Sequence, residues 1–355
     1  MATLRYEPWG EPVMREKVLI TGVAGLIGSH LAKALLDKGH DVLGVDDLSL
    51  GVQANVESYL HHERFRFCQD SILNPAKMNE ACQGVSVIFH LAAQKIPRYG
   101  GYLRTLDVNM KGTEIMLECA RSANARLIFA STDDVYGKGL DTSFTEESPL
   151  VLGESRIHRW GAAASKIYGE HLCFAYAEKY GIPVAIIRYS GVYGPTLHLS
   201  RLSGAQDLFI AAALTDRPIP IHGDGNQTRP FTYISDAVDA TLKIFETPYA
   251  DNEVINVGSA GQISIVNLAY LIWRLVGIPK KPQLRFIPYT DFSRLYEDPL
   301  QRRVDSSKAN YLLGYRPRVD LEEGMQLQVQ WFRNNLENIR ALNPEFFQEE
   351  ENPKT

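Results

Sequence analysis

Apolar runs of strand length alternate with amphipathic stretches through the first half of the chain. Lys17–Gly22 is a mainly apolar run that ends at a glycine-rich turn, and Leu26–Lys38 continues with helical spacing. Further runs of strand length follow at 41–45, 65–67, 85–90, 126–130 and 184–188. This alternation predicts an α/β fold, a doubly wound parallel sheet with helices on both faces.

The pattern changes after residue 188, where segments rich in Gly, Pro and Ser separate shorter elements. We expect helices at 265–276 and about 321–340, and a frayed acidic end at 344–355. These changes predict a second, smaller mixed α/β lobe that faces the substrate. The predicted division is a nucleotide-binding domain at 17–188 with 231–260, a substrate lobe at 189–230 with 261–330, and terminal extensions at 1–16 and 344–355.

Composition narrows the class of protein. The 355 residues are 45% hydrophobic with a formal net charge of −5, which argues against nucleic acid as a partner. The four cysteines are widely spaced, so we expect reduced thiols and no metal site. The first 16 residues lack an apolar signal core, and the longest apolar runs are too short to cross a membrane. We therefore expect a cytoplasmic protein.

The segment 21–28 has the pattern of a dinucleotide-binding turn, because it follows a strand and opens a helix. Gly22 permits the tight turn, Gly25 lets the backbone approach a pyrophosphate, and Gly28 allows close packing of helix on strand. Asp46 and Asp47 end the next strand about 20 residues later, where a carboxylate accepts hydrogen bonds from ribose hydroxyls.

A carboxylate at that place repels a 2′-phosphate, so a Rossmann-type NAD site is favoured over an NADP site. Asp70 follows the third strand, where it either reaches the adenine edge or caps a turn. The remaining cofactor candidates flank these motifs; they are Leu26, Ile27, Ser71, Leu91, Ala92 and Ala93.

A hydroxyl and two carboxylates end the fifth strand, at the sheet edge where α/β proteins bind ligands. Thr132, Asp133 and Asp134 there can hydrogen-bond a sugar hydroxyl and exchange protons with it. The alternative is that the two aspartates only start a turn.

With these motifs the chain resembles the extended short-chain dehydrogenases/reductases of the nucleotide-sugar epimerase/dehydratase family, over residues 17 to about 330. The matching pieces are TGVAGLIG, VDDLS, HLAAQK, DVNMKGT, ASTDDVYG, ASKIYGE, IIRYSGVYGP, IHGDGNQTRPFTYISD and INVGS. The resemblance implies tightly held NAD that transiently oxidises a sugar carbon, commonly C4. It also implies a homodimer through helices near 103–121 and 160–180, although core packing explains the same pattern.

The resemblance assigns roles at the centre of the site. Thr132 matches the active-site Ser/Thr, Lys166 the lysine that binds the nicotinamide ribose, and Tyr189 the aromatic segment under the nicotinamide. Ala162 falls on the tyrosine that takes the C4 hydroxyl proton. A phenol at 162 would share a helix face with Lys166, whose charge would favour phenolate. We interpret Ala162 as an engineered replacement of tyrosine, rather than a natural variant or a shifted acid.

Other residues are assigned to the substrate. Arg229 and Arg302 resemble the arginines that clasp a nucleotide diphosphate, with surface ion pairs as the alternative. Lys95 and Arg98 would suit a C6 carboxylate, unless they pair with Asp133 or face solvent. Ser190 stands in the segment of the phosphate contact, where Ser190-Gly191 replaces the Phe-Asn that is common in the family.

Three hypotheses follow for the function. The first is an NAD-dependent UDP-sugar 4-epimerase acting on UDP-glucuronate or UDP-glucose, inactive through Ala162. The second is a 4,6-dehydratase or UDP-glucuronate decarboxylase of the same fold; we rank it lower because Asp134 is shorter than the glutamate of those enzymes. The third is a non-catalytic protein that binds NAD and a UDP-sugar.

Overall fold

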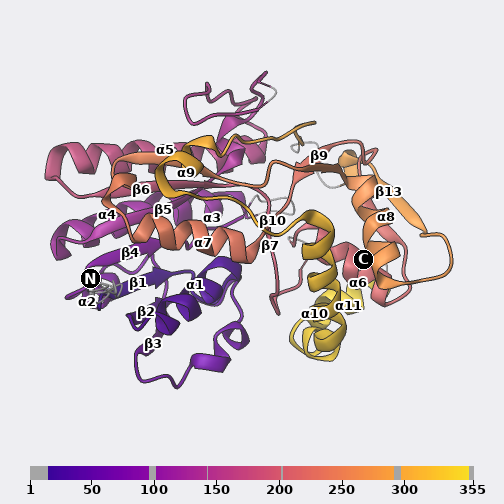
Figure 1. The fold of residues 1–355 in the computed structure, drawn as a ribbon, viewed down its shortest axis with the longest axis horizontal. Helices are drawn as coiled ribbons and strands as arrows, with labels where there is room; N and C mark the ends of the chain where they lie inside the picture. Colours follow the sequence, from indigo (N-terminus) through magenta and orange to yellow (C-terminus); the bar gives the residue numbers. More distant parts are fainter. Residues whose placement is uncertain (1–14, 96–100, 142, 201–202, 292–296, 352–355) are drawn as a thin grey trace, which may run out of the picture.

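The central element of the computed structural model is a seven-stranded parallel sheet (Figure 1). The structure describes residues 15–95, 101–141, 143–200, 203–291 and 297–351. In spatial order the strands are β11 (Glu253–Val257), β6 (Val184–Tyr189), β5 (Arg126–Thr132), β4 (Val87–His90), β1 (Lys17–Thr21), β2 (Asp41–Val45) and β3 (Phe65–Cys68). The predicted doubly wound sheet is confirmed, with β11 from late in the chain at one edge.

Helices cover both faces of the sheet. One face carries α1 (Leu26–Asp37) and α7 (Ile234–Phe245), which pack against each other and share a core with β1 and β6. The opposite face carries α2 (Pro75–Ala81), α4 (Gly112–Ala123) and α5 (His158–Tyr180). Before α4 the chain forms α3 (Tyr102–Leu106) and a π-helical turn at Asp107–Lys111. The central strands are buried on both faces, which explains their continuous apolar runs, whereas the edge strand β3 leaves Arg66 exposed.

The second lobe lies beside the sheet, on the right of Figure 1. Its core is shared by α6 (Ala205–Leu214), α8 (Ile265–Val276) and α10 (Leu321–Leu342), with β8 (Ile219–His222) and β13 (Leu284–Ile287) paired in parallel. Short strand pairs join β7 (Val192–Tyr193) to β10 (Thr232–Tyr233) and β9 (Thr228–Pro230) to β12 (Gln262–Ser264). The helix α9 (Ser307–Leu313) returns to β11.

The chain's end differs from the prediction. The expectation of a frayed end at 344–355 is wrong for its first part, because α11 (Pro344–Glu351) is helical. Phe347 is buried in the core of the second lobe, so the helix has an apolar anchor that the acidic composition concealed.

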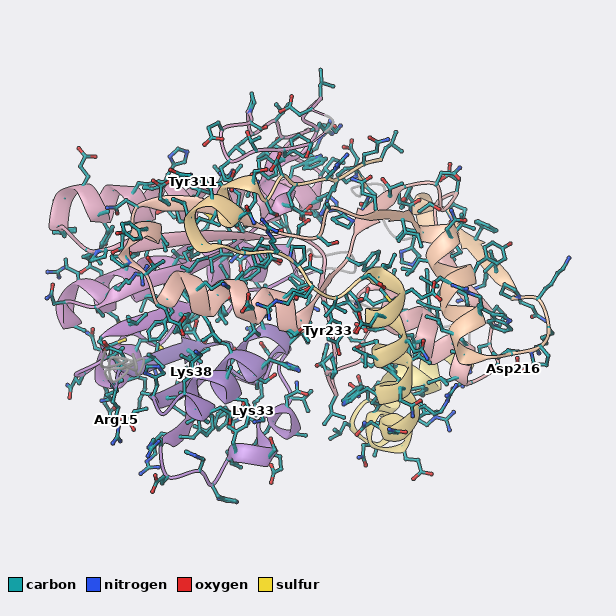
Figure 2. All side chains as sticks on the ribbon, viewed as in Figure 1. Arg15, Lys33, Lys38, Asp216, Tyr233 and Tyr311 are labelled. Atoms are coloured by element: carbon teal, nitrogen blue, oxygen red, sulfur yellow. The ribbon has the colours of Figure 1, made fainter. Side chains whose placement is uncertain are left out.

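The two cores meet near the cavity described below. Tyr233, labelled in Figure 2, packs against the apolar clusters of both the sheet and the second lobe. In the part of the chain that the structure describes, no helix is long and apolar enough to span a lipid bilayer.

Candidate functional site

A cavity of about 610 Å³ lies between the carboxyl edge of the sheet and the second lobe. The glycine-rich turn, the ends of β2, β4 and β5, the start of α6 and the segment around Arg229 all contribute to its wall. Parallel α/β sheets bind ligands at this edge, because the loops after the strands converge there.

The glycine-rich turn is shaped for close approach of a ligand. Gly22 has φ +74°, and a Cβ there would stand 2.9 Å from the Cα of Ala92. A Cβ on Gly28 would overlap the carbonyl oxygen of Gly22. Helix α1 begins after Gly25 without a side-chain cap and has no acidic residue in its first turn. Its N-terminal N–H groups and dipole therefore favour an anionic ligand.

The two carboxylates after β2 differ in environment. Asp46 is buried; its side chain accepts hydrogen bonds from the backbone N–H of Ala24 and of Leu48, both at 2.9 Å. Burial raises the pKa of Asp46, and these two N–H groups oppose the rise. Asp47 is more exposed and pairs with Arg104 at 3.2 Å. Both line the cavity, with Asp46 tied directly to the glycine-rich turn.

The other cofactor candidates also line the cavity. They are Leu26, Ile27, Asp70, Ser71, Leu91, Ala92, Ala93 and Tyr189. Asp70 accepts hydrogen bonds from the Ser71 backbone N–H at 2.7 Å and from the Asn74 amide at 3.2 Å, so it does organise a turn while facing the cavity. The hydroxyl of Tyr189 is engaged with Thr241 of α7 at 2.6 Å, on the core side. The donors and the close-approach glycines fit a dinucleotide.

Lys166 is buried on α5. Its Nζ donates to the carbonyl oxygen of Ala130 at 2.7 Å and lies 4.8 Å from the ring centre of Phe129. Burial lowers the pKa of Lys166 to about 8. Ala162, one turn earlier, is buried too, and its carbonyl oxygen accepts a hydrogen bond from the Ser165 hydroxyl at 2.7 Å. The helix therefore holds a buried cation one turn from a methyl group that cannot carry a proton.

Thr132 caps a short 3₁₀ turn at Asp133–Tyr136 and lines the cavity. Its hydroxyl accepts a hydrogen bond from the backbone N–H of Asp134 at 3.2 Å, so the predicted turn is present at the cavity wall. Asp133 accepts hydrogen bonds from the Ser190 hydroxyl at 2.6 Å and from Arg302 at 3.1 Å.

Asp134 lies between two arginines. It pairs with Arg159 at 2.6 Å and also with Arg302. Burial acts to raise the pKa of Asp134, but the two guanidinium groups hold it below its ordinary value. Asp134 is therefore ionised at neutral pH and fixes both arginines beside Thr132.

A second carboxylate extends this charged cluster into the other lobe. Asp298 pairs with Arg159 at 2.7 Å and with Arg229 at 2.5 Å. Arg159 also donates to the carbonyl oxygen of Glu297 at 2.9 Å. Arg159, on α5, thereby anchors the segment that carries Arg302, and Asp298 links it to Arg229 on β9.

Several predicted substrate residues have other surroundings than expected. Ser190 is fully buried, and its hydroxyl bonds Asp133 rather than reaching the cavity, so its place as a substrate contact is corrected. Arg98 lies outside the described residues. Lys95 lines the cavity. Burial raises the pKa of Asp207 in the second lobe and the charge of Lys95 opposes that rise, whereas burial and Lys95 both lower the pKa of His198.

Sequence reasoning missed five charged or titratable residues of the wall: Arg159, Asp298, Asp207, His198 and His222. Arg159 stands three residues before Ala162, but its two carboxylate partners lie 25 and 139 positions away. The sequence showed only that position 159 is an arginine, because ion pairs between distant positions depend on the tertiary fold.

The fold and the site together define an extended short-chain dehydrogenase/reductase. A model of the NAD dependent epimerase/dehydratase family matches residues 18–258. The chain belongs to this family, and NAD is its cofactor.

Known relatives differ in the reaction named for them. The UDP-N-acetyl-alpha-D-glucosaminuronate decarboxylase of Bacillus cytotoxicus is 36% identical over 92% of this chain and all of its own length. UDP-glucuronic acid decarboxylase 1 of Xenopus tropicalis is 34% identical over 91% of this chain and 74% of its own. The UDP-glucuronic acid 4-epimerase of Bacillus cereus, solved with UDP-glucuronic acid and NAD, matches 90% of this chain and 99% of its own, at a TM-score of 0.80 and 32% identity.

Proposed function

We propose that this chain binds NAD and a UDP-hexuronate, that its site is built for oxidation at C4 followed by loss of CO₂, and that Ala162 blocks the first step. The observation that carries the proposal is the pairing of an intact charged site with a missing acid/base. Thr132, Arg229 and Arg302 line the cavity, and Lys166 is buried one helix turn from position 162, which offers only a methyl group.

The cofactor site supports the oxidative step. NAD, when bound, would accept a hydride from C4 of the sugar and return it to C4 after CO₂ has left, so that the product is a UDP-pentose and the cofactor is regenerated. The glycine-rich turn and the N-terminus of α1 bind its pyrophosphate, and Asp46 receives an adenosine ribose hydroxyl. Thr132 hydrogen-bonds the sugar hydroxyl at C4. Lys166 places a positive charge beside position 162, where it would stabilise a phenolate.

Two arginines on the cavity wall support a substrate with a carboxylate and a diphosphate. Arg229 and Arg302 line the cavity, and guanidinium groups suit both anions. A hexuronate oxidised at C4 is a β-keto acid. Its C5–C6 bond breaks, CO₂ leaves, and the electron pair passes into an enolate over C5, C4 and O4. The Arg302 charge, held by Asp133 and Asp134, stabilises that enolate, which then takes a proton at C5.

The relatives named as decarboxylases support loss of CO₂ rather than epimerisation, which the short Asp134 side chain favoured in the sequence analysis. Asp134 does not need to reach C5 itself, because Arg302 also lines the cavity and pairs with both Asp133 and Asp134. The length of the Asp134 side chain is then a weak argument against decarboxylation.

The test is to restore the phenol and weigh the product. Ala162→Tyr protein, loaded with NAD and incubated with UDP-glucuronate, is expected to release CO₂ and give a UDP-pentose. A product of unchanged mass would support 4-epimerisation, and loss of water would support a dehydratase. A restored protein that binds both ligands and yields no product would refute the catalytic proposal and favour a binding protein. Ala163→Tyr, one position along the same helix, is the matched control.

Epimerisation is the second candidate, and a specific observation favours it. The match to the 4-epimerase from Bacillus cereus covers 90% of this chain and 99% of the epimerase, at a TM-score of 0.80, so a fold of this kind accommodates epimerisation. A 4-epimerase needs the keto sugar to turn over before hydride returns, which the mass measurement combined with separation of isomeric sugars detects.

A further inference from the structure

Asp207 is a buried carboxylate on the cavity wall that the proposed reaction does not use. It lies in the first turn of α6 and is 7% exposed. The Gln328 amide donates to one of its oxygens at 3.0 Å and the Gln206 amide donates to the other at 3.2 Å. These two contacts and the helix N-terminus hold the carboxylate in one place.

Lys95 lines the same cavity as this carboxylate. It follows β4, two residues after the Leu91–Ala93 segment that lines the cofactor part of the site. Its charge acts on Asp207 and on His198, and all three residues line the same cavity. The nucleotide-binding domain thus contributes a cation, Lys95, to the cavity, and the second lobe contributes an anion, Asp207.

We propose that Asp207 is a specificity-determining residue that competes with an oxyanion of the bound ligand for Lys95. The oxyanion belongs either to a phosphate of the dinucleotide or to the carboxylate of a hexuronate. The second source rests on the function proposed above. In either case the protein's own carboxylate weakens binding of the anion, because it occupies the cation and repels like charge.

The competition depends on pH in a defined direction. Burial raises the pKa of Asp207 to about 6, while Lys95 and the two amides oppose the rise. Burial and Lys95 lower the pKa of His198 to about 4, so this ring stays neutral above pH 5. Between pH 8 and pH 5 Asp207 takes up a proton and releases Lys95. Affinity for the competing oxyanion should therefore rise as the pH falls.

The experiment is isothermal titration calorimetry of NAD, and then of UDP-glucuronate and UDP-glucose on the NAD-loaded protein. At pH 8, Asp207→Asn is expected to tighten the competing ligand about tenfold, the order for one charge in a partly hydrated cavity. Tighter binding of NAD identifies a phosphate of the dinucleotide as the competing oxyanion. Tighter binding of UDP-glucuronate, with unchanged binding of UDP-glucose, identifies the hexuronate carboxylate. At pH 5 the unmodified chain should approach the variant.

Two controls make the result specific. Asp224→Asn removes an exposed carboxylate of the same lobe and should leave all three affinities unchanged. In a Lys95→Met background, Asp207→Asn should give no tightening, because the contested cation is gone. The proposal is overturned if Asp207→Asn tightens neither ligand, if its gain persists without Lys95, or if the unmodified chain shows no gain in affinity from pH 8 to pH 5. This last series needs no substitution. The NAD titrations test the proposal for a phosphate of the dinucleotide even if UDP-glucuronate does not bind.

Discussion

Replacing Arg159 by methionine removes the cation that joins the two lobes at the cavity. The Arg159 side chain is 2% exposed, and its three nitrogen donors reach Asp134 at 2.6 Å, Asp298 at 2.7 Å and the Glu297 carbonyl at 2.9 Å. Methionine retains the apolar stem and leaves two buried carboxylates short of one partner each. Removing one member of a buried ion pair costs about 3–5 kcal/mol. Because Arg302 and Arg229 remain, we expect a loss near the lower end of that range.

The assay is urea unfolding at pH 7.5, with Arg156→Met as the matched control. Arg156 stands three positions earlier, its side chain is 80% exposed, and its pair with Glu154 is on the surface. Surface pairs contribute about 0–1 kcal/mol, so the control should unfold almost as the unmodified chain does. A loss below about 1 kcal/mol for Arg159→Met would refute the assigned role of this cluster.

The difference in the free energy of unfolding between Arg159→Met and the unmodified chain should also depend on pH. Arg302 and Arg159 hold the pKa of Asp134 below its ordinary value against the effect of burial. A carboxyl group with a lowered folded-state pKa stabilises the protein above its unfolded pKa and loses that contribution as the pH falls. The difference in the free energy of unfolding between Arg159→Met and the unmodified chain should therefore become smaller below pH about 4. A gap that widens in acid would contradict the electrostatic explanation.

Two further predictions concern the cofactor site. Gly22→Ala should abolish measurable NAD binding, because position 22 has φ +74° and the new Cβ would meet the Ala92 backbone at 2.9 Å. A calorimetric titration checks this, with Gly261→Ala as control, because a Cβ there would meet only the Ser259 hydroxyl oxygen, at 3.8 Å. The unmodified chain should bind NAD at least about tenfold more tightly than NADP, because the buried carboxylate of Asp46 repels a 2′-phosphate. Asp46→Asn should bring the two dissociation constants closer together. The same ratio of these constants in both proteins would contradict the role of Asp46.

The sheet could be predicted from the sequence because its signals are local. β1 and β2 bury every second residue or more, and the predicted runs 17–22 and 41–45 match the observed strands within one residue. The glycine-rich turn is also a local signal, since Gly22 needs its positive φ whatever surrounds it. The helix at 265–276 is capped by Ser264 and ended by Gly277, so both limits could be predicted.

The charged wall of the cavity could not be predicted in the same way. Arg302 and Asp134 are 168 positions apart, and their contact depends on how the second lobe returns to the sheet. Ser190 shows the converse. The family resemblance placed it in a segment that contacts the ligand, whereas the alternation of side chains along an extended segment turns it into the core toward Asp133. Asp207 gave no signal at all, since a single aspartate in a helical segment is typical of a solvated surface.

The central claim is that the site is complete except for the phenol at position 162. The most direct measurement compares the unmodified chain with Ala162→Tyr at saturating NAD and UDP-glucuronate, with ligand affinity and product formation followed in the same samples. We predict affinities that agree within about threefold and product formation that is faster by about 10²–10⁴ in the tyrosine variant, the range for one general acid/base. Equal turnover by the two proteins, or failure of the unmodified chain to bind either ligand, would contradict the claim.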